Sequence, residues 1–202
     1  MEERPLPSCA APLESGRASQ PAIFNKTMRR LFEEHVTWTR LLIISVAATL
    51  PDRLSTGQRL ARSQAEIGQT LRPFYGDWSG ARMVALLREH VSRCVELVDA
   101  AKAENRAAIE RARSANYDTG NEIARFFARV NPSRWPLRFV GGTMRNIIDL
   151  TLMMAFARVH GDHFVEIAAY EQLRQELLAV ADLLSDGIIG QFPDTFLTAD
   201  PA

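Results

Sequence analysis

Two stretches of the chain carry closely similar sequences: LFEEHVTWTRLLI at residues 31–43 and LLREHVSRCVELV at residues 86–98. Five positions are identical, and His35 and His90 are one of these pairs. The segments that follow also repeat, because AEIG at 65–68 aligns with NEIA at 121–124 at almost the same offset, 56 residues instead of 55. Two consecutive matches at one offset indicate a duplicated helical hairpin.

A third, more diverged copy of the hairpin follows the second. The segment MRNIIDLT at 144–151 lies 57 residues after the matching part of the second copy. This alignment puts Ile147 where the first two copies have histidine. Three copies are too few for an open solenoid, so we expect three hairpins packed into one compact bundle.

Apolar residues recur at spacings of three and four from residue 25 onward, which is typical of amphipathic helices. No run of β-branched residues alternates with polar ones over five positions, so no strand is expected. Prolines and the PFYG turn at 73–76 separate the helices, and Trp135 is expected to fold back on the core. The predicted helices cover residues 25–50, 52–72, 77–104, 106–130, 137–159 and 162–191.

The fold class predicted from this pattern is all-α: a compact bundle of six helices in three antiparallel hairpins with internal duplication. Residues 1–24 contain four prolines and no apolar period, which predicts a disordered tail. The bundle domain is expected over 25–194, with hairpins at 25–76, 77–132 and 136–193. Residues 195–202 are expected to be a loose tail.

Composition argues against several functional classes. Among 202 residues, 24 Lys and Arg balance 24 Asp and Glu, so no excess charge points to nucleic acid or to an anionic membrane. No apolar stretch reaches the roughly 20 residues that span a bilayer. Only eight residues precede Cys9 in a lipoprotein-like LPSC box, too few for a signal peptide. Since Cys9 and Cys94 are the only cysteines in the sequence, we expect no disulfide framework. We expect a soluble cytoplasmic protein.

The two repeated histidines are the strongest candidate site. His35 and His90 lie on leucine-bearing helix faces, so they are expected to converge in the centre of the bundle. With Glu66, Glu122 and Asp182 from the partner helices they could bind zinc, iron or manganese. The alternative is a pair of core histidines with hydrogen-bonded neighbours, which the lack of HxxxH, ExxH or CxxC spacing favours. The ferritin-like di-metal pattern is not found.

A ligand pocket is expected beside these histidines. Thr39 and Cys94 each follow a histidine by one helical turn. Trp38, Arg40 and Tyr75 complete the predicted lining, since arginine suits carboxylate or phosphate. No GxSxG motif or phosphate loop is found, which favours a non-enzymatic protein.

Three functions remain open. The first is a bundle that binds a small ligand or a protein partner through its interhelical core, without a cofactor. The second is a metal-binding bundle, with a divalent transition metal and a metal-dependent activity. The third is a structural or homo-oligomerising protein without a pocket.

The motifs LFEEHVTWTR, EIG followed by PFYG, and ADLLSDGII followed by QFP resemble those of an uncharacterised family of small bacterial helical proteins. The resemblance covers about residues 28–196 and implies no established activity. In that family the third hairpin usually carries histidine in the place of Ile147. This chain departs from the pattern there, which weakens any chemistry that needs three histidines.

Overall fold

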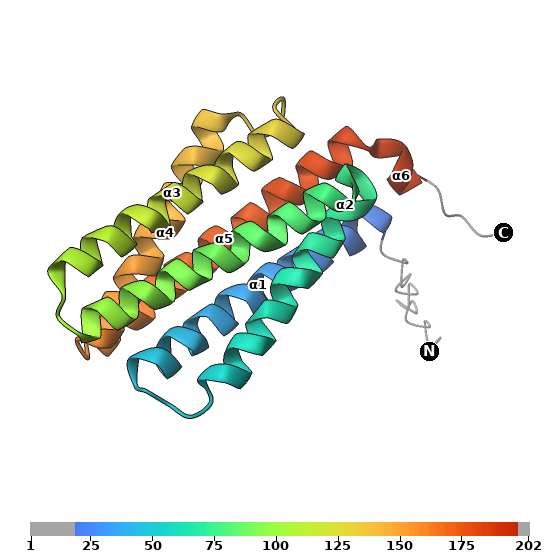
Figure 1. The fold of residues 1–202 in the computed structure, drawn as a ribbon. Coiled ribbons are helices and arrows are strands. Elements are labelled where there is room, and N and C mark those ends of the chain that lie inside the picture. The colour runs from blue at the N-terminus through green and yellow to red at the C-terminus, as the bar shows by residue number, and fades with distance from the viewer. Residues whose placement is uncertain (1–18, 198–202) are drawn as a thin grey trace, which may run out of the picture.

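The computed structural model describes residues 19–197, and within that range it contains helices and no strand. This confirms the predicted all-α bundle (Figure 1). The helices are α1 (Gln20–Ala47), α2 (Arg53–Lys102), α3 (Arg106–Val130), α4 (Leu137–Val159), α5 (His163–Gln191) and the short α6 (Pro193–Leu197).

Helix α2 contains both of the helices predicted on either side of the PFYG turn. Gly76 has φ 81° and ψ 168°, which is not helical and which glycine adopts without steric cost. The chain reverses direction at this point, so α2 forms a hairpin bent on itself (Figure 1). The first half of α2 therefore belongs to the first hairpin and the second half to the second.

The three hairpins close into one bundle. Helix α1 packs against α2 and α5, α3 packs against α2 and α4, and α4 packs against α5. Contacts of α4 with α1 and α2 cross the centre of the bundle. The helices that begin the three hairpins, which are α1, the second half of α2 and α4, therefore surround a common interior.

The segment between α3 and α4 covers one end of the core. Trp135 is fully buried, and its indole Nε1 donates a hydrogen bond to the carbonyl of Leu183 at 3.2 Å. The Asn131 side-chain amide donates to the carbonyl of Gly187 at 3.0 Å. Trp135 is therefore folded back on the core, as the sequence predicts.

Both ends of the described chain are more ordered than the sequence predicts. Helix α1 begins at Gln20, inside the expected tail, and α6 continues to Leu197, inside the expected C-terminal tail. The rings of Phe24 and Phe196 pack on each other, with centroids 5.3 Å apart, and both contact Phe74 beside the bend in α2. This aromatic cluster packs both ends of the described chain against the bend in α2. The rest of both predicted tails, with Cys9, lies outside the described residues.

No helix between residues 19 and 197 is long and apolar enough to cross a membrane.

Candidate functional site

The centre of the bundle contains a small cavity lined by equivalent residues of the three hairpins. His35 from α1, His90 from α2 and Ile147 from α4 all line it. One turn earlier, Phe32, Leu87 and Met144 do the same. The two repeated histidines, His35 and His90, therefore converge in the centre of the bundle, as the repeat predicts.

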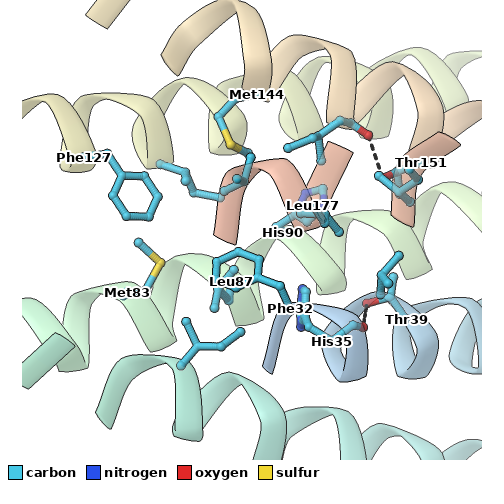
Figure 2. A pocket seen from close by; sticks show the side chains of 16 residues that line it. Phe32, His35, Thr39, Met83, Leu87, His90, Phe127, Met144, Thr151 and Leu177 are labelled. Carbon is cyan, nitrogen blue, oxygen red and sulfur yellow. Dashed lines mark hydrogen bonds between the residues drawn. The ribbon is translucent and has the colours of Figure 1, made fainter. Parts of the chain in front are cut away.

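The cavity has a volume of about 50 Å³, and its lining is mainly apolar (Figure 2). For comparison, an engineered cavity of about 150 Å³ takes up benzene. The cavity as it stands therefore has room for a few water molecules or for a ligand of a few non-hydrogen atoms.

The two histidines are the main polar groups of this lining. Their exposed fractions are 6% for His35 and 7% for His90. Burial lowers the pKa of His35 to about 3, with a smaller contribution from repulsion by His90 when that imidazole is protonated. Burial also lowers the pKa of His90 to about 4. Both imidazoles are consequently neutral at pH 7.

The Nδ1 atom of each histidine is buried and has no hydrogen-bond partner within the described part of the chain. A buried polar atom without a partner costs about 1–3 kcal/mol, so it is normally paired with protein or solvent. The two histidines that carry these atoms line the same cavity, which is unusual for a plain core.

A short series of polar contacts links His90 to Cys94 and Asn116. The Cys94 thiol donates to the Asn116 Oδ1 atom at 3.2 Å, and its Sγ lies 3.8 Å from the His90 Nε2 atom. Burial raises the pKa of Cys94 to about 12, so the thiol keeps its proton. Because that proton goes to Asn116, we assign the Nε2 proton to His90, which leaves its Nδ1 as a free acceptor.

Two hydroxyl groups complete the polar part of the lining. Thr39 donates to the carbonyl of His35 at 2.8 Å, and Thr151 donates to the carbonyl of Ile147 at 2.8 Å (Figure 2). Each threonine therefore bonds back to its own helix, one turn along from the histidine position. Their oxygen atoms can still accept a hydrogen bond.

The structure does not bring the predicted carboxylates to the histidines. Asp182 pairs with Arg29 and accepts from the Asn25 amide at 3.0 Å. Glu122 pairs with Arg82. Glu66 is not among the residues that line the cavity.

Residues 19–197 accordingly hold no group of three or more His, Cys, Asp or Glu side chains placed to bind a metal ion. The predicted set of two histidines with Glu66, Glu122 and Asp182 is therefore wrong. Asp182 and Glu122 pair with arginines instead.

The predicted ligand pocket is also only partly assembled. Thr39 lines the cavity, and Cys94 contacts His90 behind it. Trp38 lies under the guanidinium of Arg59, 5.1 Å from the ring centroid. Arg40 instead pairs with the buried Glu166, Nε to Oε1, at 2.6 Å.

Tyr75 also lies away from the cavity and donates to the Gln191 side chain at 2.8 Å.

The apolar residues that line the cavity were not predicted from the sequence. Among them, Phe32, Leu87 and Met144 follow the repeat offset, and that offset is the signal that could have found them.

The fold and the cavity together define an all-α bundle of three repeated hairpins around a histidine-lined interior. Comparisons of the chain with protein-family models, with curated proteins and with solved structures found no match. The resemblance to a bacterial helical family therefore stays a prediction from the motifs.

Proposed function

We propose that this protein binds a small neutral ligand in the central cavity. The observation that carries the proposal is the pair of buried imidazoles, His35 and His90, which line one cavity and whose Nδ1 atoms have no partner within residues 19–197. A ligand that supplies a hydrogen bond there removes part of the cost of burying them. Ligand sites are commonly apolar pockets with a few convergent polar groups, which matches this lining.

The volume of the cavity and the charge of its lining limit which ligands can bind. A volume of about 50 Å³ admits only a few non-hydrogen atoms. Neutral imidazoles offer no full charge to compensate an anion, and an unpaired ion in an apolar cavity is strongly disfavoured. The part of the ligand inside the cavity is therefore neutral, with a hydroxyl or a similar group for the imidazoles.

The test uses two probes of different polarity. Xenon tests whether the cavity takes up an apolar atom, and 2-propanol tests whether the imidazoles select a hydroxyl. Both are titrated into the full chain and into the His35→Leu, His90→Leu double variant, with methyl and amide NMR shifts as the readout. We expect xenon to bind both proteins and 2-propanol to perturb the cavity residues of the wild type alone.

Absence of both probes from the wild-type cavity would overturn the proposal. The histidines would then be core residues of a structural or oligomerising bundle. Equal 2-propanol binding by the wild type and the double variant would show instead that the imidazoles do not select the ligand.

A further inference from the structure

A second hollow lies at the surface between α3 and α4. It has a volume of about 400 Å³ and a mixed polar and apolar lining. Its polar groups come from Arg113, Tyr117 and Asn121 of α3 and from Arg145 and Asp149 of α4. It is thus far larger and more polar than the central cavity.

Met144 lines both the central cavity and this surface cleft. Its side chain is 8% exposed and lies among the lining residues drawn in Figure 2. A methionine side chain has three rotatable bonds and adapts its shape easily. Met144 is therefore an adaptable side chain that the two spaces share.

The side chains that line the cleft have an excess of positive charge. Asp149 already accepts a hydrogen bond from the Tyr117 hydroxyl. Arg113 and Arg145 supply two guanidinium groups against this one lining carboxylate, and Glu110, outside the lining, lies close enough to Arg113 to interact with its charge. Arginine binds carboxylates well, through paired N–H donors in a fixed plane.

We propose that the cavity and the cleft form one site for a short hydroxy-carboxylic acid. The carboxylate lies in the cleft at Arg113 and Arg145, the chain passes Met144, and the hydroxyl reaches the imidazoles of His35 and His90. This inference rests on the proposed function, since it extends the neutral end of the ligand outward. It also explains how a cavity of about 50 Å³ serves a larger molecule.

Three probes of equal chain length separate the two ends: 6-hydroxyhexanoate, hexanoate without the hydroxyl, and 1,6-hexanediol without the carboxylate. Calorimetric titration of the full chain gives the affinities, and NMR shifts locate the bound probe. We expect 6-hydroxyhexanoate to bind most tightly, with each truncated probe weaker by about tenfold, the value of one good hydrogen bond.

Two variants with a matched control complete the test. Arg145→Gln should weaken 6-hydroxyhexanoate and hexanoate by several-fold but leave 1,6-hexanediol unchanged. Arg138→Gln, an exposed arginine of the same helix outside the cleft, should change none of them. Met144→Ala should speed association of 6-hydroxyhexanoate, because the side chain shared by the cavity and the cleft becomes much shorter.

The proposal is overturned if the three probes bind equally, or if 6-hydroxyhexanoate perturbs the cleft but not the residues around His35 and His90. Uptake of xenon and 2-propanol in the same protein would then leave the proposed function standing. If xenon and 2-propanol also failed to bind, both this inference and the proposed function would be overturned.

Discussion

Gly68 and Gly80 approach each other through their backbones across the bend in α2. A Cβ atom placed on Gly80 would lie 2.6 Å from the carbonyl oxygen of Gly68, and one placed on Gly68 would lie 2.7 Å from that of Gly80. Both residues are buried. Glycine at these two positions allows the two halves of α2 to pack against each other after the chain reverses at Gly76.

Gly80→Ala should therefore destabilise the protein by about 2–3 kcal/mol, because neither backbone can move away without opening the bend. Denaturant unfolding measures this change. Gly141→Ala is the control, since a Cβ there meets nothing within 4 Å and alanine favours a helix. The control should be neutral or more stable by up to about 1 kcal/mol. Equal effects of the two substitutions would show that the close approach is unimportant.

The neutral histidines predict a loss of stability in mild acid. Their pKa values are lowered from 6.5 to about 3 for His35 and about 4 for His90. The unfolded chain therefore binds more protons below about pH 6.5, and the free energy of unfolding falls as the pH falls from 7 to 5. The decrease approaches about 1.4 kcal/mol per pH unit for each histidine.

Unfolding free energies at pH 7, 6 and 5 test this prediction. The His35→Leu, His90→Leu variant should have a flatter pH dependence and should be at least as stable at pH 7, because it buries no unpaired nitrogen. Replacing the exposed His160 and His163 by Gln should leave the wild-type slope unchanged. A double Leu variant with the wild-type slope would contradict the burial of neutral imidazoles.

Replacing Trp135, with Trp78 as the exposed control, tests the packing of the core. Trp135 is fully buried and packs directly on the backbone of Gly187, whereas the exposed fraction of Trp78 is 63%. Trp135→Ala should cost about 3–5 kcal/mol and Trp78→Ala about 0.5 kcal/mol or less. Thermal or urea unfolding distinguishes the two, and a small effect at Trp135 would refute its place in the core.

Glu166 should matter far more than its exposed neighbours on α5. Its side chain is 2% exposed, and its carboxylate binds Arg40 at 2.6 Å and lies 3.7 Å from the guanidinium of Arg158. Glu166→Gln should lower stability by about 2 kcal/mol, because a buried ion pair loses one charge. The exposed Glu171→Gln should change it by no more than about 0.5 kcal/mol. If both variants unfold at the same urea concentration, the ion pair between α1 and α5 contributes nothing.

The repeat is the most informative signal in the sequence. A nearly constant offset between helices indicates which residues share a position in each hairpin, so the pattern predicts that His35 and His90 lie together and aligns Ile147 with them. The carboxylate partners could not be predicted in this way, because helix periodicity does not determine the rotation of one helix against another. Asp182 and Glu122 are also drawn to arginines on neighbouring helices.

Contacts between segments that are distant in the sequence also cannot be predicted from the helical pattern. The hydrogen bond from Cys94 to Asn116 depends on the relative register of α2 and α3. The helical ends at Gln20 and Leu197 depend on Phe24 and Phe196 meeting, although these residues are far apart in the chain. Local composition indicates a loose tail at both places, and tertiary packing outweighs it.

Ile147 gives the cavity two unlike sides. The walls from α1 and α2 present imidazoles, while the equivalent wall from α4 presents an aliphatic side chain. With three imidazoles, a bound molecule would find hydrogen-bonding groups on every side and no reason to choose among them. With two, the α4 wall offers the proposed ligand only the Thr151 hydroxyl oxygen, while α1 and α2 offer imidazoles. An isoleucine at the third position would thus favour one orientation of that ligand, with its hydroxyl toward α1 and α2.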